Sequence, residues 1–233
     1  AAAKTGVPAD IPVFKSIGDN QASFLGSVRD AERWILLNLV TGGQICWAVP
    51  EFACPSRAVE TRPLPEGRFL RVGASLCGGA AYAWLNRTVR RWLAEFGMEV
   101  NAEAVYERLN ALAVASQDTE GLKVRTTFLG SRGDPAVQAG AIEGIPPDNL
   151  DLGKLARATL HGIVDELCNL YEEHDGRTGG HLRLVATGGG VRENLLMPDV
   201  IAERFGMPVT IPGQRESAAL GAAMLAGEAL AGR

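Results

Sequence analysis

The sequence lacks the features that mark membrane proteins and nucleic-acid-binding proteins. Its longest apolar run, Trp34 to Val40, is interrupted by Asn38 and is much shorter than the roughly 18 residues that a membrane helix needs. Lysine and arginine number 23 against 27 aspartate and glutamate residues, so no basic excess is available to neutralise a phosphate backbone. We therefore expect no transmembrane span and no nucleic acid as the main partner.

Cysteine and histidine are scarce and scattered. The four cysteines form no C-x-x-C pair and the three histidines lie apart in the chain, which argues against a structural zinc site. Most of the cysteines stand in apolar or helical sequence, where a reduced thiol acts as a small hydrophobic side chain. The first residues, AAAKTGVPADIP, contain no apolar core of the length that a signal peptide has. We expect a reduced, cytoplasmic protein.

Glycine is the residue in excess. The chain has 28 glycines in 233 residues, about 12% where ~7% is usual. They follow no period but gather in groups at Gly42-Gly43, Gly78-Gly79, Gly179-Gly180 and Gly188 to Gly190. A glycine group after a strand lets main-chain N–H groups approach an anion such as phosphate, although turns and helix ends are commoner reasons for glycine. The P-loop pattern GxxxxGK[ST] is absent, and GxGxxG fails at Glu193.

Apolar periodicity predicts strands that alternate with helices, an α/β layout. The predicted strands are Arg33 to Thr41, Gln44 to Val49 as its hairpin partner, Arg68 to Val72, the run LRLVAT and the short run PVTIP. The predicted helices follow Asp19 and span Ala80 to Phe96, Ala102 to Ala115, Asp151 to Glu173, Glu193 to Phe205 and the Ala-rich end from Glu216. We expect Thr119 to Pro147, which has two adjacent prolines, to be a loop excursion.

Several motifs follow one another along the chain: GDNQASFLG, LNLVTGGQICW, LCGGAAYAWL, LGSRGDPAVQAGAIEGI and the long segment that begins at Ala186. In this order they resemble the C-terminal half of the FGGY family of carbohydrate kinases, which phosphorylate sugars and polyols with ATP. GDNQASFLG is similar to the family's catalytic-aspartate segment, LNLVTGGQICW to its second phosphate loop, and LCGGAAYAWL to its glycine loop on the nucleotide side. LGSRGDPAVQAGAIEGI resembles a degenerate form of the G-E-R-x-P segment, and ATGGGVRENLLMPDVIAERFGMPVTIPGQRESAALGAAMLAG resembles the adenosine motif with its closing helix. SIGDNQASFLG and LCGG are most similar to sedoheptulokinase-type members.

The resemblance implies a fold, ligands and a missing partner. The fold is an actin-like ATPase domain of the ribonuclease H type, the second of two domains that hold ATP and sugar in a cleft. Residues 1–233 correspond to this C-terminal domain. The first phosphate loop, its acidic residue near Mg²⁺ and most sugar-binding residues belong to an N-terminal domain with no counterpart here. We expect ATP, Mg²⁺, a sugar and that domain as partners, and no metal ligand within this chain. Whether the protein forms a homodimer is left open.

Asp19 and Asn20 are the residues that the resemblance places at the sugar. Asp19 matches the family's general base, which takes the proton of the sugar hydroxyl as it attacks the γ-phosphorus. The alternative is that Asp19 caps the helix that follows. Asn20 aligns with a position that contacts substrate hydroxyls in polyol-specific relatives, and the alternative is an exposed asparagine in a turn.

The same comparison assigns a phosphate loop to Thr41 and Gly42. The threonine hydroxyl and the glycine N–H would donate to the β- and γ-phosphates of ATP, whereas a plain hairpin turn is the alternative. Val40 departs from the family pattern, which usually has glycine at this position, and this narrows the room for backbone approach.

The remaining nucleotide residues also follow from the resemblance. Gly79 matches a glycine against the phosphates, while Ala83 stands where glycerol-specific relatives carry glutamine. Gly188, Gly189 and Gly190 resemble the loop that passes the adenosine, with a strand-to-helix turn as the alternative. Asn194 lies near an adenine-contacting asparagine of relatives, although the alignment also allows Glu193 at that position.

Two functional hypotheses follow. The first is the ATP-side half of an ATP-dependent kinase that acts on a ketose such as sedoheptulose, with the fragment alone inactive in transfer. The second is a nucleotide-binding interaction module of the actin-like superfamily, or a degenerate kinase, with no sugar substrate. Sugar-independent ATP hydrolysis or nucleotide-dependent partner binding would favour the second.

Overall fold

The computed structural model describes Gly6, residues 11–176 and residues 180–231. Gly179, one member of a predicted glycine pair, and most of the first ten residues, where we expected no signal peptide, lie outside the described residues. The chain divides into a small unit, residues 1–27 with 216–233, and a large unit, residues 28–215. Each unit is considered by itself below.

A six-stranded sheet with the order β3-β4-β2-β1-β7-β8 forms the centre of the large unit. Strand β1 pairs in parallel with β7, and β7 in parallel with β8, whereas β2 is antiparallel to both β1 and β4. Strands β1, β4, β7 and β8 therefore run in one direction, as the predicted ribonuclease H-type fold requires. The strands are β1 (Trp34–Leu39), β2 (Gly43–Val49), β3 (Val59–Pro63), β4 (Phe69–Ser75), β7 (Arg183–Thr187) and β8 (Val209–Thr210).

The central strands are buried at successive positions. Ile35, Leu36 and Leu37 are each at most 1% exposed, which explains why this segment reads as a continuous apolar run rather than as an alternation. The predicted hairpin is confirmed, since Leu39 pairs with Gly43 in an antiparallel register.

The helices of the large unit follow the predicted pattern closely. They are α3 (Gly79–Glu95), α4 (Ala102–Ala115), α5 (Leu152–Tyr171), α6 (Gly189–Arg192) and α7 (Met197–Phe205), with a single 3₁₀ turn at Pro65–Gly67 and a π-helical turn at Glu172–Gly176. Helix α3 ends before Gly97, whose φ of 74° is the left-handed conformation of a helix-terminating glycine. Asn101 and Asp151 cap α4 and α5 by accepting N–H bonds from Ala104 and Lys154.

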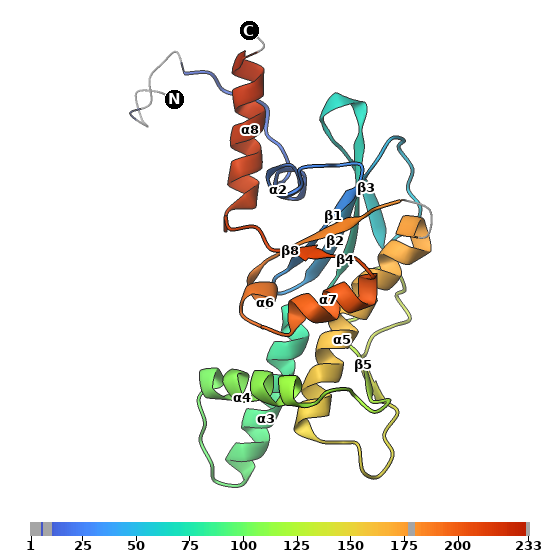
Figure 1. The fold of residues 1–233 in the computed structure, drawn as a ribbon, viewed down its shortest axis with the longest axis vertical. Coiled ribbons are helices and arrows are strands. Elements are labelled where there is room, and N and C mark those ends of the chain that lie inside the picture. The colour runs from blue at the N-terminus through green and yellow to red at the C-terminus, as the bar shows by residue number, and fades with distance from the viewer. Residues whose placement is uncertain (1–5, 7–10, 177–179, 232–233) are drawn as a thin grey trace. The chain divides into compact units, whose positions relative to one another are not determined.

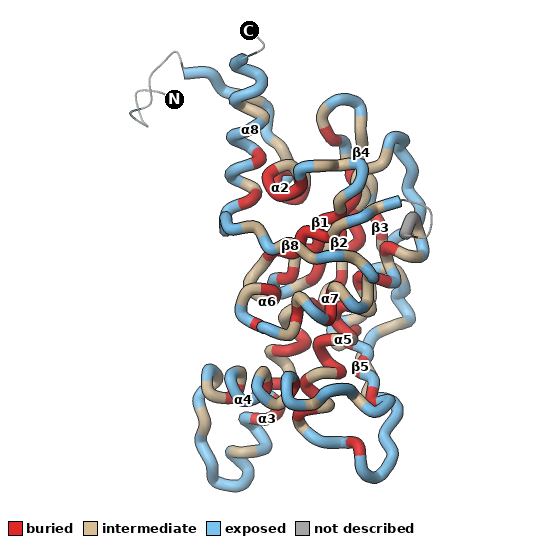
Figure 2. Tube along the Cα trace, viewed as in Figure 1, coloured by how far each residue is buried: buried red, intermediate tan, exposed pale blue. Residues whose placement is uncertain are grey.

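Helix α5 carries the main apolar stripe that packs on the sheet. Trp47 of β2 meets Tyr171 of α5 edge to face, with ring centroids 5.3 Å apart, and Leu167 lies so close to Gly43 that an added Cβ would come within 2.9 Å of its side chain. Figure 2 shows the buried residues concentrated along α5 and the strands. This core fixes the strand ends that carry the glycine groups.

Two predictions about elements are wrong, and one strand was not predicted. The segment Thr119 to Pro147 is not only a loop, because β5 (Lys123–Arg125) and β6 (Ala141–Glu143) form an antiparallel pair within it. Strand β3, at the sheet edge, has no predicted counterpart. The helix predicted from about Glu193 to Phe205 begins only at Met197, as α7, because Pro198 has no N–H to donate and is favoured only in the first turn of a helix.

The small unit consists mainly of helices α2 (Asp19–Ser27) and α8 (Ser217–Ala231). They pack at a point where both carry glycine: a Cβ on Gly26 would overlap the Ser217 carbonyl oxygen, and a Cβ on Gly221 would overlap that of Ala22. Glycine is therefore required at this crossing for the two backbones to approach.

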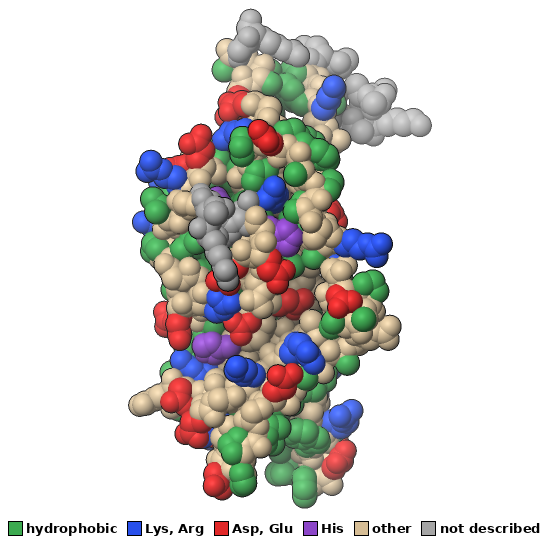
Figure 3. Space-filling view, turned by 90° about the vertical axis from the view of Figure 1, so that its right-hand side faces the viewer, with side chains coloured by type: hydrophobic (Ala, Val, Ile, Leu, Met, Phe, Trp, Pro, Cys, Tyr) green, Lys and Arg blue, Asp and Glu red, His purple; other side chains and the backbone are tan. Residues whose placement is uncertain are grey.

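Two observations concern the expectation that the chain has no transmembrane span and no nucleic acid as its main partner. Over the described part of the chain, we find no helix with the length and apolar character needed to cross a bilayer. On the face shown in Figure 3, lysine and arginine side chains are interspersed with aspartate and glutamate, so this face carries no basic patch of the kind that follows a nucleic-acid backbone.

Candidate active site

Three of the predicted glycine groups lie at one edge of the sheet. Because β1, β4 and β7 run in the same direction, their carboxyl ends meet at the same edge, where α/β proteins commonly bind ligands. The segments that follow these strands begin at Val40, Leu76 and Gly188. Figure 1 shows α6 and the start of α3 at this end of the strands.

Two of the glycine groups interlock backbone to backbone. The N–H of Gly79 donates to the Val40 carbonyl at 2.8 Å, and the N–H of Ala80 donates to that of Thr41 at 2.9 Å. A Cβ on Gly79 would lie 2.6 Å from the Val40 oxygen, and a Cβ on Gly42 would lie 2.9 Å from the Ser75 oxygen. These glycines therefore hold the β1–β2 turn against the start of α3. The N–H of Gly79 is already used within the protein.

In the third glycine group, Gly189 has more open space around it than Gly188 and Gly190 have. Gly188 has a φ of 97°, and a Cβ there would overlap the Leu39 carbonyl; a Cβ on Gly190 would lie 3.2 Å from the same oxygen. In contrast, the nearest atom to a Cβ on Gly189 would be Oε1 of Glu193, at 3.6 Å. No packing contact of the described residues requires glycine at position 189.

A cavity of about 890 Å³ opens beside these loops. Its walls come from the end of β1 and the turn that follows it, from α3, α4 and α5, and from the α6–α7 segment. Five of the predicted nucleotide residues line it: Thr41, Gly79, Gly189, Gly190 and Asn194. Gly42 and Gly188 are their immediate neighbours but are not among the described residues that line the cavity.

Asn194 is held by hydrogen bonds within the protein. It is 6% exposed, its Oδ1 accepts the Leu196 N–H at 3.0 Å, and its Nδ2 donates to Oδ1 of Asn110 at 2.9 Å. The hydroxyl of Tyr82 donates to the same Asn110 oxygen at 2.9 Å. Burial raises the pKa of Tyr82, so its phenol stays protonated and remains a donor. This network ties the α6–α7 turn to α3 and α4.

The cavity also contains residues that the sequence did not reveal. Tyr82 and Tyr106 stack with ring centroids 6.1 Å apart, and both line the cavity with Asn110. In the sequence these residues show only helical spacing, which cannot be distinguished from ordinary core packing. Among the described lining residues, Arg87 is the only lysine or arginine, whereas Glu103, Glu107 and Glu193 supply carboxylates.

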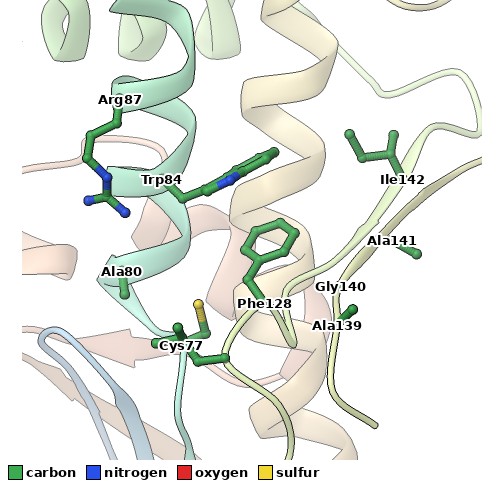
Figure 4. A pocket seen from close by; sticks show the side chains of 10 residues that line it. Cys77, Ala80, Trp84, Arg87, Phe128, Ala139, Gly140, Ala141 and Ile142 are labelled. Carbon is green, nitrogen blue, oxygen red and sulfur yellow. The ribbon is translucent and has the colours of Figure 1, made fainter. Parts of the chain in front are cut away.

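A second, smaller cavity of about 460 Å³ shares Arg87 with the first. In Figure 4, Trp84 of α3 extends toward Phe128, and the two ring centroids are 4.3 Å apart. Cys77 also lines this cavity, and burial raises the pKa of its thiol, which disfavours the reactive thiolate. Because no predicted site residue lines this cavity, the larger cavity is the candidate site.

Asp19 and Asn20 lie in the small unit. Asp19 is exposed at the first position of α2, and its Oδ1 accepts the N–H of Asn20 at 2.8 Å. Gly18 precedes the helix and its carbonyl accepts the Ala22 N–H at 2.9 Å, while the Asp19 carboxylate satisfies an N–H of the first turn, as the capping alternative expects. Asn20 is helical and 8% exposed, which excludes the exposed-turn alternative.

Comparisons with known proteins agree with this architecture. The family model for the C-terminal domain of the FGGY family of carbohydrate kinases matches residues 51–230. Sedoheptulokinases of Mus musculus and Homo sapiens are each 30% identical to the chain over 94% of its length. The chain spans about half the length of these curated relatives, 46% in both cases.

Solved structures show the same fold. A xylulose kinase from Rhodospirillum rubrum superposes with a TM-score of 0.83 at 27% identity, over 97% of this chain and 44% of that protein. A ligand-bound xylulose kinase from Lactobacillus acidophilus gives 0.84 at 22% identity, over 100% of this chain and 46% of that protein. The predicted actin-like, ribonuclease H-type fold and the predicted resemblance are confirmed: the chain belongs to the FGGY family of carbohydrate kinases.

Proposed function

We propose that the large cavity binds ATP and that the chain is the ATP-side half of a kinase that phosphorylates a hydroxyl of a ketose such as sedoheptulose. The observation that carries this proposal is the convergence of Thr41, Gly79, Gly189, Gly190 and Asn194 on one cavity at the carboxyl ends of the strands. Sedoheptulokinases are among the similar relatives, which favours a ketose as the acceptor.

The two ends of the cavity suit the two ends of ATP. At the strand ends, Thr41 offers a hydroxyl donor, and α3 begins with its dipole positive toward the loops. Elsewhere in the lining, Tyr82 and Tyr106 offer aromatic surface, and Leu160, Ile163 and Met197 add apolar surface, which a flat base requires. The phosphates would lie at the strand ends and the base beside the tyrosines.

Gly79 and Gly42 contribute to this site mainly by their small size. The N–H of Gly79 is bonded to Val40 and a Cβ there would meet the Val40 oxygen, so this glycine would position the loop of Thr41 without donating to the phosphates. The exposed Val40 side chain stands at the turn itself, and Thr41 remains the donor at this position.

Mg²⁺ would arrive with the phosphates of ATP. In the part of the chain that the structure describes, no group of three or more His, Cys, Asp or Glu side chains could hold a metal ion. When bound, Mg²⁺ neutralises charge on the transferring phosphoryl group. Ligands for it within the protein would come from the N-terminal half.

Asp19 would act as the general base of transfer. Its exposed carboxylate would accept the proton of the sugar hydroxyl while the hydroxyl oxygen bonds to the γ-phosphorus and ADP leaves. Asn20 would hold the sugar through its amide.

Substitution of Gly189 tests the nucleotide site. A valine there meets no packed neighbour within 3.6 Å of its Cβ but projects its methyl groups at the cavity lining. We expect Gly189→Val to lower the affinity for ATP in calorimetry by at least tenfold, about 1.4 kcal/mol, with little change in melting temperature. Gly227→Val is the matched control, because its Cβ has no atom within 4 Å and it lies outside the cavity.

The Gly189→Val and Gly227→Val results together distinguish a side chain that blocks the approach of ATP from a general disturbance of the structure. Unchanged ATP affinity in Gly189→Val would contradict the proposed site. An equal loss in the Gly227→Val control would show that the effect is not local. Absence of ATP binding by the unmodified chain would reject the nucleotide assignment altogether.

A further inference from the structure

We propose that the smaller cavity is a second ligand site, which takes a small carboxylate with a compact apolar body of about phenyl size. The cavity lies between α3 on one side and the segments that leave β5 and enter β6 on the other. Its volume of about 460 Å³ falls within the range of small-molecule sites, about 300–1,000 Å³. The site requires neither ATP nor the N-terminal half of the kinase.

One wall of this cavity is apolar. Trp84 of α3 and Phe128 lie with their ring centroids 4.3 Å apart, and Ile142 of β6 also lines the cavity (Figure 4). Gly140 makes room for the Phe128 ring, because a Cβ on this glycine would overlap it. Both rings are only partly buried, so they have apolar surface that a ligand can remove from water.

Arg87 is the only charged side chain among the described residues that line this cavity. It is exposed, and it forms no hydrogen bond or ion pair with the described residues. In Figure 4 its side chain runs back along α3 toward Ala80. Burial raises the pKa of the Cys77 thiol, and the Arg87 charge opposes this shift. The positive charge is therefore felt at Cys77, on the lining of the cavity.

This lining favours a carboxylate over a sugar or a phosphate ester. A guanidinium presents a planar fork of N–H donors that matches a carboxylate with two parallel hydrogen bonds. A sugar or a phosphate ester needs several polar partners, but Arg87, Trp84 and Cys77 are the only described lining residues with a polar side-chain atom. The Cys77 sulfur is already engaged by the backbone N–H groups of Phe128 and Leu129. One cation beside an apolar wall therefore selects a monocarboxylate with an apolar body.

Calorimetry with the 233-residue chain, in the absence of nucleotide, tests this assignment. The probes are 3-phenylpropionate, 3-phenylpropionamide, which lacks the charge, and acetate, which lacks the apolar body. We expect 3-phenylpropionate to bind at least tenfold more tightly than either of the others, a difference of about 1.4 kcal/mol. Arg87→Gln should reduce its affinity to that of the amide. Arg91→Gln removes an exposed arginine of the same helix outside the cavity and should leave the affinity unchanged.

Matched leucine substitutions distinguish the two cavities, because Arg87 lines both. Ala139 lines only the smaller cavity and Ala83 only the larger one. We expect Ala139→Leu to lower the affinity for 3-phenylpropionate at least tenfold, since the new side chain occupies the space of the ligand, and Ala83→Leu to leave it unchanged. Ala136→Leu adds the same bulk to an exposed position outside both cavities and controls for stability, with melting temperature as the measurement.

Several results would overturn the inference. Equal affinity for the acid and the amide would show that Arg87 does not select the ligand. Equal affinity for 3-phenylpropionate and acetate would show that the apolar wall is not used. Binding that is weakened by Ala83→Leu but not by Ala139→Leu would place the ligand in the larger cavity. Absence of binding by all three probes would reject the site, and the nucleotide assignment would still be tested separately by ATP calorimetry.

Discussion

At the scale of single residues, Glu193 and Asn194 are adjacent in the sequence but differ in burial and in hydrogen bonding at the cavity. The family resemblance allows either Glu193 or Asn194 at the adenine-contacting position. Their partners separate them, since the Asn194 amide is bonded to Asn110 and Leu196 while Glu193 is exposed at the lining. The motif resemblance predicts a polar residue near the proposed nucleotide, whereas burial and hydrogen bonds show that the Asn194 amide is already engaged within the protein.

Glu166 is a residue whose ionisation opposes folding. It lies in α5, mostly out of contact with water, and this burial raises the pKa of its carboxyl group, although hydrogen bonds with Ser75 and Thr126 oppose the shift. The folded state therefore binds the proton more tightly than the unfolded state does, so stability falls as pH rises from about 4.5 through the raised pKa.

Glu166→Gln should remove this pH dependence. We expect the variant and the unmodified chain to melt at similar temperatures below pH 4.5, where both states of Glu166 are protonated, and the variant to melt higher at pH 7. Thermal melts between pH 4 and 8 measure the difference, with the exposed Glu95→Gln as control. A variant that is less stable at pH 7, or a difference that does not change with pH, would contradict the assigned cause.

At the scale of elements, the junction of the β1–β2 turn with α3 depends on glycine. The 2.6 Å approach of a Gly79 Cβ to the Val40 oxygen cannot be relieved by a side-chain rotation, because the backbone fixes the Cβ position and the oxygen belongs to the backbone. We expect Gly79→Ala to cost about 1–3 kcal/mol, as overpacking does, and to lower the melting temperature by several degrees. Gly213→Ala, with no atom within 4 Å of its Cβ, should have little effect.

The same variant should weaken ATP binding, because it displaces the loop that carries Thr41. Gly79→Ala therefore differs from Gly189→Val, which should weaken binding alone. A Gly79→Ala protein with unchanged melting temperature would show that the turn can shift at no cost, and the structural role given to this glycine would be wrong.

The elements that were predicted from the sequence are those with strong periodicity. Helix α4 has the predicted bounds, Ala102–Ala115, because a capping asparagine and an apolar stripe both mark it. The pair β5 and β6 was missed because each strand has three residues, too few to show alternation. Strand β3 was missed because VETRP is polar and ends in proline, which suits an edge strand.

At the scale of the molecule, the candidate site was predicted in part. The order of the glycine motifs indicated the family, and the parallel direction of β1, β4 and β7 explains why distant motifs converge. The wall formed by Tyr82, Tyr106 and Asn110 could not be predicted, because their helical spacing is also that of core residues and their contacts arise only when α3 packs against α4. The extent of the kinase, of which residues 1–233 would be the C-terminal domain, stays a prediction.

The most direct test of the account is phosphoryl transfer by the chain joined to its N-terminal half. The measurement is ATP-dependent formation of sugar phosphate from sedoheptulose, pentuloses and glycerol. We predict phosphorylation of a ketose, and a loss of about 10²–10⁴-fold in Asp19→Asn with unchanged affinity for ATP. ATP hydrolysis with no sugar phosphorylated across the panel would contradict the kinase assignment and favour a nucleotide-dependent interaction module, and full activity in Asp19→Asn would contradict the role of Asp19 as base.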